Sequence, residues 1–301
     1  MQQLTPDVYV ETNLRGANVG FVVTGEGVVL IDSPMIPSEA RLWREQIAEI
    51  TDQEIIYLIN TDHHRGHILG NQYLTTAVIA HELAWKEMKS YGDSFRQRLI
   101  NLFKDSEPKV AAEFENLEII LPRLTFTNRM TLHKGNKTIR LIHVGGHTPA
   151  SSLVHVVEDG LLFAGDIVIN DGHPFLGHGN SKEWLNALTF IRQLKVEVIV
   201  PGHGEVCGKE ALQKLSEYIR EMRTQVRKLY LAGCSKTETA SRVNLLHFFP
   251  VSDRDRQKIR KRFKASIGRV YEEIKADHNQ SSEVKRKQKE SEEQPYENGS
   301  E

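Results

Sequence analysis

Histidine and aspartate residues follow several predicted strands of this 301-residue chain. Three of its 13 histidines fall in the segment 61–67, which reads TDHHRGH. His147 and His203 each stand beside glycine residues, and Asp166 follows a glycine at the end of an apolar run. Neutral imidazole and carboxylate groups are the ligands that zinc and similar divalent ions take in proteins. Since glycine allows loops to approach each other closely, these segments predict a metal cluster.

The segments that precede these residues have the pattern of strands. Residues 55–59 form a continuous apolar run, as in a strand covered on both faces, and the histidine-rich segment follows directly. Strands grouped between helices in both halves of the chain predict an α+β fold, a four-layer αββα sandwich of two packed sheets with helices outside. The predicted strands are 7–12, 19–24, 28–32, 55–59, 77–80, 117–120, 137–144, 153–157, 161–164 and 196–200, and the predicted helices are 38–50, 82–104 and 182–194.

The chain beyond residue 207 has a helical pattern. Apolar residues spaced alternately by three and four predict an amphipathic helix over 208–232, which ends at Gly233. A capping-box pattern at Ser235 begins a second helix, and a third apolar face runs from 259 to 274. The final residues hold few large apolar groups among many charges, which predicts disorder. We therefore expect an αββα domain over 1–207, a C-terminal helical subdomain over 208–276 and a disordered charged tail over 277–301.

The composition excludes several classes of protein. With 39 Lys and Arg against 40 Asp and Glu, the net charge of −1 gives no general attraction to nucleic acid or anionic lipid. No apolar run reaches the roughly 18 residues of a membrane-spanning helix, and the first residues lack the pattern of a secretion signal. Two cysteines cannot form a disulfide framework. We expect a cytoplasmic protein with a small-molecule substrate and no membrane or nucleic-acid partner, and we leave a homo-oligomer open.

The motifs, taken in order, resemble those of the metallo-β-lactamase-fold superfamily. The resemblance covers about residues 7–205. It implies an αββα sandwich with a metal site at one edge of the two sheets. The matching features are Asn18, Asp32, the segment 61–67, Gly146-His147-Thr148, Gly165-Asp166 and Pro201-Gly202-His203-Gly204.

The chain departs from the usual family motif, His-x-His-x-Asp-His, at two positions. Asp62 stands where the motif has its first histidine, and Gly66 stands where it has its aspartate. The resemblance then implies six ligands instead of seven. Site one would hold Asp62, His64 and His147, and site two would hold His67 and His203, with Asp166 bridging the two or belonging to site two.

The moved carboxylate changes the expected chemistry of both sites. A carboxylate in site one makes its metal a weaker Lewis acid, and two imidazoles with one carboxylate suit iron(II) as well as zinc. Site two lacks the carboxylate that orients the attacking hydroxide in this family. We therefore expect Asp62 to be a catalytic residue that supplies the missing carboxylate. Asp32 is expected to hold a ligand loop rather than to bind metal, and His63 is expected to point to solvent.

The resemblance implies a metal-dependent hydrolase in which metal-activated water attacks a small-molecule ester, thioester, amide or phosphate. The expected cofactor is one or two zinc ions, with iron or manganese as alternatives. His173 and His178, on a glycine-rich loop, are expected to contact substrate. Two other functions stay open: a mononuclear iron oxygenase of the persulfide dioxygenase type, and a degenerate member that binds a ligand without turnover.

Overall fold

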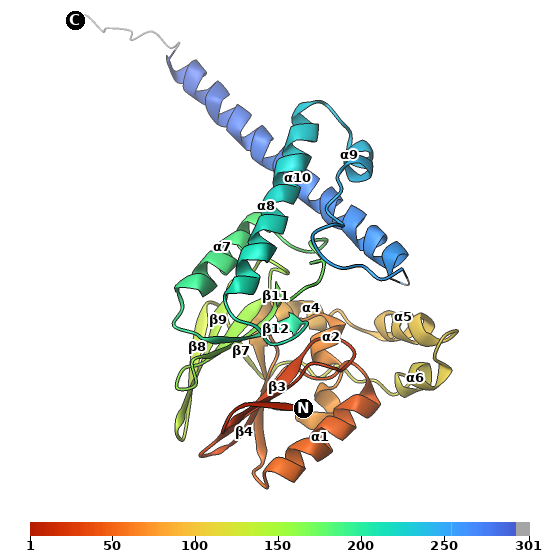
Figure 1. Cartoon of the computed structure of the whole chain (residues 1–301), viewed down its shortest axis with the longest axis vertical. Coiled ribbons are helices and arrows are strands. Elements are labelled where there is room, and N and C mark those ends of the chain that lie inside the picture. Colours follow the sequence, from red (N-terminus) through yellow and green to blue (C-terminus); the bar gives the residue numbers. More distant parts are fainter. Residues whose placement is uncertain (254, 293–301) are drawn as a thin grey trace, which may run out of the picture. The chain divides into compact units, whose positions relative to one another are not determined.

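A computed structural model of the chain describes residues 1–253 and 255–292. Figure 1 shows its strands and helices in sequence colours. The strands are β1 (Gln2–Thr5), β2 (Val8–Glu11), β3 (Val19–Thr24), β4 (Gly27–Ile31), β5 (Ile55–Ile59), β6 (Val78–His81), β7 (Leu124–Phe126), β8 (Arg129–Lys134), β9 (Lys137–His143), β10 (Ser152–Val156), β11 (Leu161–Ile169) and β12 (Val198–His203). The helices are α1 (Pro37–Ile50), α2 (Arg65–Ile68), α3 (Asn71–Leu74), α4 (Glu82–Met88), α5 (Asp93–Phe103), α6 (Pro108–Glu113), α7 (Ser181–Gln193), α8 (Glu210–Leu231), α9 (Lys236–Arg242) and α10 (Arg256–Glu292).

Two mixed sheets form the centre of the fold. One contains seven strands in the order β1-β2-β3-β4-β5-β6-β7, and the other contains five in the order β12-β11-β10-β9-β8. Their facing sides enclose one apolar core, to which Val29 and Ile59 of the first sheet and Leu141, Val154 and Phe163 of the second contribute. Helices flank both sheets, so the predicted αββα architecture is confirmed.

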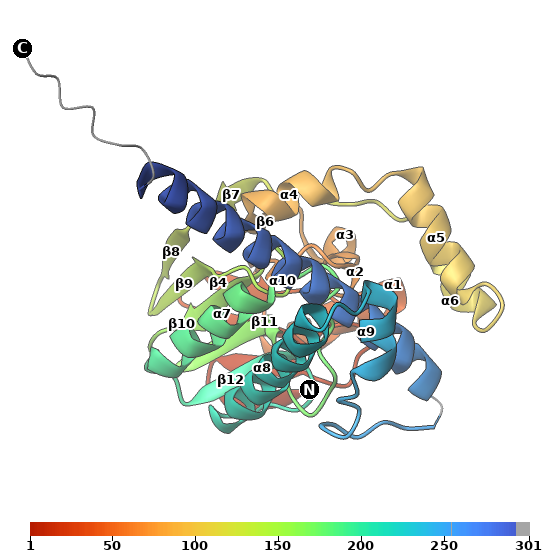
Figure 2. The ribbon, with the colours of Figure 1, turned by 90° about the horizontal axis from the view of Figure 1, so that it is seen from above.

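The outer helices cover the sheets through regular apolar faces. Trp43 and Ile47 of α1 pack on Phe21 and Leu30, on the outer face of the seven-stranded sheet. On the five-stranded sheet, α7 begins at Asn180, whose side chain caps its first turn. Figure 2 shows α7 beside the strands of this sheet. The layers hold in place the loops after β5 and β9, the strand β11 and the end of β12, and these segments carry the predicted site residues.

Several elements of the structure differ from the prediction. Residues 117–120 form no strand, because Leu117 and Ile119 pack into the apolar cluster around α5 and α6. The predicted helix 82–104 is two helices, α4 and α5, separated at Gly92. Strand β8 was not predicted. Its alternating exposed and half-buried residues place one face of an edge strand toward water.

Contacts divide the chain into two compact units. The first is Met1–Pro174 with His178–Glu217, and the second is Phe175–Gly177 with Tyr218–Glu301. The division falls within α8, beyond the boundary expected at 207, because the start of α8 belongs with the first unit. Within α8, Lys214 pairs with Asp171 at 2.8 Å. Just before the helix, Lys209 Nζ donates to the carbonyl oxygen of Leu194 at 2.6 Å.

The second unit consists mainly of helices, as expected. Tyr218 and Ile219 of α8 are buried, as are Ile267 and Val270 of α10, and Ser235 forms the predicted capping box at α9. Helix α10 continues to Glu292, whereas disorder was expected from residue 277. Lysine, glutamate and glutamine are good helix formers, and extending an existing helix needs no new nucleus. The rest of the predicted tail, residues 293–301, lies outside the described residues.

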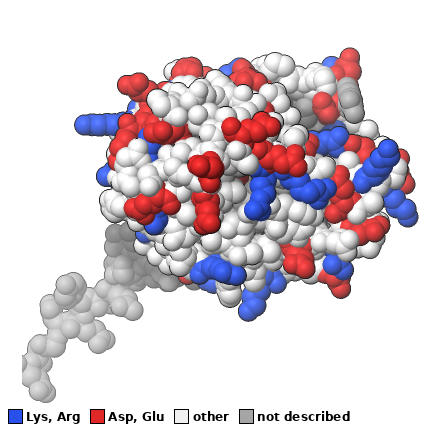
Figure 3. All heavy atoms as spheres, turned by 90° about the horizontal axis from the view of Figure 1, so that it is seen from below, with Lys and Arg blue, Asp and Glu red and all other residues white. Residues whose placement is uncertain are grey.

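Acidic and basic residues are nearly equal in number in this chain. On the face drawn in Figure 3, acidic and basic side chains lie interspersed. Among the described residues, no helix is long and apolar enough to cross a membrane.

Candidate metal centre

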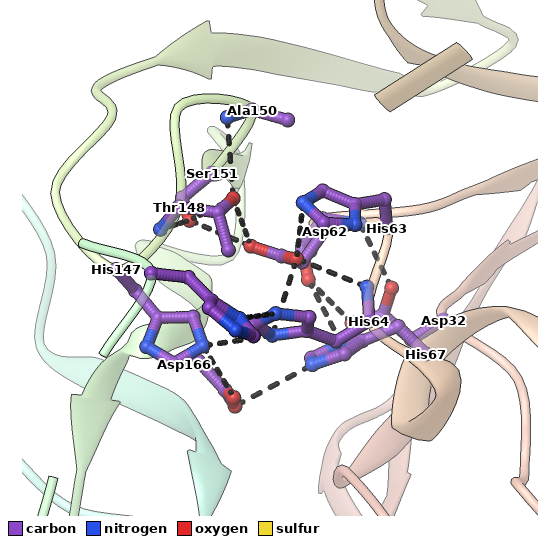
Figure 4. Close-up of polar contacts among 12 residues, drawn as sticks. Asp32, Asp62, His63, His64, His67, His147, Thr148, Ala150, Ser151 and Asp166 are labelled. Atoms are coloured by element: carbon purple, nitrogen blue, oxygen red, sulfur yellow. Dashed lines mark hydrogen bonds and ion pairs between the residues drawn. The ribbon is translucent and has the colours of Figure 1, made fainter. Parts of the chain in front are cut away.

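The predicted site residues come from four places in the two sheets. Asp62 and His64 lie in the loop after β5, and His67 lies in the short helix α2 that follows. His147 lies between β9 and β10. Asp166 is in β11, and His203 ends β12. Figure 4 shows the labelled members of this group facing one another from both sheets.

Backbone hydrogen bonds tie the two sheets together beside these residues. Ser152 N–H donates to the carbonyl oxygen of Thr61 at 2.9 Å, which joins the loop after β5 to β10. Asn18 N–H donates to the carbonyl oxygen of Gly202 at 2.8 Å, and the side-chain amide of Asn18 adds bonds to the carbonyl oxygens of Pro201 at 2.9 Å and Gly204 at 2.8 Å. The loops that carry the histidines are therefore held by the fold itself.

Asp62, His64 and His147 form the first cluster. One potential ligand atom from each residue lies within 4.8 Å of the other two. His64 Nδ1 is 3.0 Å from His147 Nε2 and 3.6 Å from Asp62 Oδ1. Asp62 and His147 are almost fully buried, while His64 is partly exposed. Two imidazoles and one carboxylate at this spacing could hold a divalent cation.

Asp166 is the centre of the second cluster. Its Oδ1 lies 3.5 Å from His67 Nε2 and 3.3 Å from His203 Nε2, and its Oδ2 lies 3.2 Å from His147 Nε2. Oδ1 is buried without a hydrogen-bond partner in the described part of the chain. A buried carboxylate oxygen without a hydrogen bond is costly. An oxygen left open among imidazole nitrogens fits a cation, and Asp166 contacts histidines of both expected sites.

Glycine residues make room for this arrangement at two positions. A Cβ atom on Gly202 would lie 2.1 Å from Asp166 Oδ1, so only glycine leaves space for that carboxylate. Gly66 packs against the loop before β3. A Cβ on Gly66 would lie 3.2 Å from Ala17 N and 3.4 Å from Gly16 Cα. The position that carries an aspartate in the usual motif is therefore closely covered by backbone.

Asp62 is held rigidly by its neighbours. Thr148 Oγ1 and Ser151 Oγ donate to Asp62 Oδ2 at 2.7 and 2.6 Å, and the backbone N–H of His64 donates to Oδ1 at 3.0 Å. These three bonds fix the carboxylate plane and leave it facing His64. Neither Thr148 nor Ser151 was predicted as a site residue, although both follow His147 in the loop that the histidine motif marks.

We expect a Thr148→Val variant to weaken metal binding by about 10- to 100-fold, because valine keeps the shape of threonine but removes the hydroxyl that orients Asp62. The free energy of unfolding should fall by roughly 1.5–3 kcal/mol, the range for hydrogen bonds to charged groups. Metal titration and urea unfolding measure the two effects. Thr189→Val is the matched control, since Thr189 Oγ1 donates only to a helix carbonyl on an exposed face. Equal metal affinity in both variants would refute the orienting role.

Asp32 positions His67, as expected. Its Oδ2 lies 2.9 Å from His67 Nδ1, and the same carboxylate accepts from the N–H and the hydroxyl of Thr61 at 2.8 and 2.6 Å. A carboxylate on Nδ1 leaves Nε2 of His67 directed at Asp166. Asp32 adopts a positive φ of 57°, which aspartate tolerates better than most residues.

The pKa values of four of the six predicted ligands, Asp62, His64, His147 and Asp166, favour the protonation states that bind metal. Burial lowers the pKa of His64 to about 3 and also lowers that of His147, so both imidazoles are neutral at pH 7. Burial alone would raise the pKa of the Asp62 carboxyl, but the nearby imidazoles, His64 first, hold it below its usual range. The pKa of Asp166 is lowered in the same way, chiefly by His203. Metal ligands must be deprotonated to bind.

Burial would lower the pKa of His67, but Asp32 and Asp166 outweigh that effect and raise it well above its usual value. The two carboxylates therefore favour a protonated His67 in the metal-free chain, so this imidazole must lose a proton before it can bind metal.

The remaining predicted histidines differ in where they lie. His178 Nδ1 is 2.9 Å from His64 Nε2, which brings this loop residue to the first cluster. His173, on the same loop, is partly buried, and its contact with substrate stays a prediction. His63 does not point to solvent: it is buried, and its Nδ1 lies 2.8 Å from the hydroxyl of Tyr91. Nothing in the sequence marked Tyr91, which follows α4.

Comparisons with known proteins agree with this geometry. The family described as the metallo-beta-lactamase superfamily matches residues 12–203. A type 2 metallo-beta-lactamase from Elizabethkingia meningoseptica is 23% identical over 234 residues, which cover 73% of this chain and 85% of that protein. The human acyl-coenzyme A thioesterase MBLAC2 is 25% identical over 224 residues, which cover 67% of this chain and 78% of that protein.

Solved structures share the fold. A metallo-beta-lactamase family protein from Thermus thermophilus superposes with a TM-score of 0.66 at 18% identity, covering 92% of this chain and 95% of that chain. The sec-alkylsulfatase Pisa1 from a Pseudomonas species superposes with a TM-score of 0.69 at 14% identity. That match covers 90% of this chain and 49% of the sulfatase.

Proposed function

Because the chain belongs to the metallo-beta-lactamase superfamily and is a hydrolase of that family, we propose that it uses metal-activated water to hydrolyse a small-molecule ester, thioester or amide. The observation that carries this proposal is the convergence of Asp62, His64 and His147, with the open Oδ1 of Asp166 beside them. Two relatives, named as a beta-lactamase and as an acyl-coenzyme A thioesterase, support a carboxylic acid derivative ahead of a phosphate.

Six side chains would hold the metal. Asp62, His64 and His147 would bind one ion, and His67, His203 and Asp166 would bind a second or share the first. When bound, the metal would lower the pKa of a coordinated water to about 7 and polarise a substrate oxygen. In the chain itself, Thr148 and Ser151 hold Asp62, and Asp32 holds His67.

Asp62 compensates for the missing carboxylate of the motif. Its carboxylate places a negative charge among the imidazoles, whereas Gly66 has no side chain that could carry one. Hydrogen bonds from the hydroxyl groups of Thr148 and Ser151 fix the position of this carboxylate. His178, in contact with His64 and exposed, is placed to meet a substrate at the open side.

The proposal is tested by loading the purified chain separately with zinc, manganese and iron(II) and assaying hydrolysis of p-nitrophenyl acetate, an acyl-coenzyme A and a β-lactam. We expect bound metal by elemental analysis and metal-dependent hydrolysis of at least one of the three. Bound metal with no hydrolysis of any ester, thioester or amide would refute the proposed reaction. A chain that takes up no metal would refute the site.

One observation supports a second candidate function. Two histidines and one carboxylate, as in the first cluster, are also the ligand set of iron(II) oxygenases. The same metal series decides between the two. Oxygen consumption by the iron form with a persulfide, without hydrolysis by the zinc form, would replace the hydrolase proposal with an oxygenase.

We expect that restoring the usual motif, with Asp62→His and Gly66→Asp together, lowers activity. Gly16 and Ala17 cover the Gly66 position, so a larger side chain there should cost about 1–3 kcal/mol of unfolding free energy. Turnover and thermal unfolding of the double variant measure this. Gly92→Asp, at a position where a Cβ meets nothing within 4 Å, is the control for adding an aspartate at a glycine. Higher turnover in the double variant would instead identify the natural chain as a degenerate member.

A further inference from the structure

A cavity lies on the outer face of the five-stranded sheet, away from the candidate metal centre. It has a volume of about 590 Å³ and is bounded by strands β8, β9 and β10 and by the end of α7. Strand β8 is the free edge of this sheet, beside β9, and Figure 2 shows α7 along the same sheet. None of its lining residues belongs to the candidate metal centre. Its size falls within the range of small-molecule sites.

Three cations line this cavity. Arg129 lies on β8, Arg140 on β9, and Lys195 follows α7. All three are exposed, and within the described ranges none has a carboxylate within 4.0 Å. By contrast, Lys137 and Lys214 each pair with an aspartate. The three cations of the cavity therefore form no ion pair within the described part of the chain.

The register of the sheet aligns polar groups across the cavity floor. Thr131 pairs with Arg140, and Arg140 pairs with His155, so the three side chains form one row across β8, β9 and β10. His155 is 6% exposed, and its Nε2 is buried with no hydrogen-bond partner in the described part of the chain. Burial and the neighbouring Arg140 lower the pKa of His155. An unpaired buried imidazole nitrogen is unusual without a ligand.

Apolar side chains complete the walls. Ile142 and Val157 come from the sheet, and Phe190 and Leu194 come from the end of α7 and the residue after it. A ligand that fits must therefore offer a negative charge at one end and an apolar surface at the other. Arginine favours carboxylates, which it can bind through two parallel hydrogen bonds.

We propose that this cavity, the Arg129/Arg140 groove, is a binding site for a small organic anion with an apolar chain, of which a medium-chain carboxylate is the simplest form. Arg129 and Arg140 bind the carboxylate, and the chain lies against Ile142 and Phe190. Neither the metal centre nor the proposed hydrolysis needs this site.

The test is calorimetric titration of the full chain with octanoate. We expect saturable binding that is at least about tenfold tighter than that of octanol, which lacks the charge, or of acetate, which lacks the chain. The double variant Arg129→Gln/Arg140→Gln should weaken octanoate binding by on the order of tenfold or more. Arg123→Gln, another exposed arginine outside the groove, should leave it unchanged. The ring resonances of His155, identified by a His155→Gln variant, should shift on addition of octanoate.

Several results would overturn the proposal. One is the absence of saturable octanoate binding. Another is binding that the double variant retains in full, which would place the ligand elsewhere, such as at a bound metal. A third is a dimer that Arg140→Glu dissociates in sedimentation while octanoate fails to bind, because a second copy of the chain would then cover the groove. These measurements do not depend on hydrolytic activity. A failure to bind octanoate would therefore overturn the proposed groove but not the proposed function.

Discussion

An Asp166→Asn variant is expected to lose turnover by roughly 10²–10³-fold, the loss typical when one charge-stabilising group is removed from an active site. The Asp166 carboxylate lies 3.2–3.5 Å from imidazole nitrogens of His67, His147 and His203. Asparagine has nearly the same shape but no charge, and its amide group can place a donor where Oδ1 faces the imidazoles. Metal content should fall with turnover, since the variant loses the group that contacts both clusters.

The control for this variant is Asp171→Asn. Asp171 lies five residues further along, is exposed and pairs with Lys214 at 2.8 Å. It adopts a positive φ of 51°, which asparagine also tolerates. Elemental analysis, turnover and circular dichroism of both variants are compared. If Asp166→Asn folds and keeps its full metal content and rate, Asp166 has no part in the metal centre.

An Asp62→Asn variant should bind metal about 10- to 100-fold more weakly, with a parallel loss of turnover. Asp62 accepts hydrogen bonds from Thr148, Ser151 and the backbone of His64. An asparagine has one acceptor oxygen in place of two, so at least one of these donors loses its partner. The variant also removes a negative charge. In this chain the carboxylate of the motif stands at position 62, whereas the usual motif has it at the position of Gly66.

Asp93→Asn is the control for Asp62, because the Asp93 side chain is 90% exposed and pairs with Arg96 in the same helix. Metal titration by calorimetry and steady-state kinetics should show no change in it. Should Asp62→Asn match this control in both measurements, the carboxylate would be structural and the site would depend on the histidines alone.

The fold was predictable where one physical pattern dominated. The apolar run 55–59 becomes β5 because a strand covered on both faces needs apolar residues throughout, and α8 follows its spacing of three and four. The segment 117–120 has three apolar residues among four, yet Leu117 and Ile119 pack against helices instead of a strand. Whether such a segment forms a strand or packs against helices depends on partners that are distant in the chain, and the local sequence does not report them.

The candidate site was predictable as a set of residues but not as a geometry. His64, His147 and Asp166 could be identified because each follows an apolar run predicted as a strand and stands near glycine, although β11 in fact continues past Asp166 to Ile169. Thr148 and Ser151 could not, because hydroxyl groups are common in loops and only the folded chain brings them to Asp62. The close cover over Gly66 comes from residues about 50 positions earlier, and no local pattern reports it.

The central claim is that side chains from both sheets meet to hold a catalytic metal. The most direct test is a crystal structure of the zinc-loaded chain with anomalous scattering data collected on both sides of the zinc absorption edge. We predict an anomalous peak bounded by Asp62, His64 and His147, with Asp166 in contact with it or with a second peak beside His67 and His203. Crystals soaked in zinc that show no peak among these residues would contradict the account.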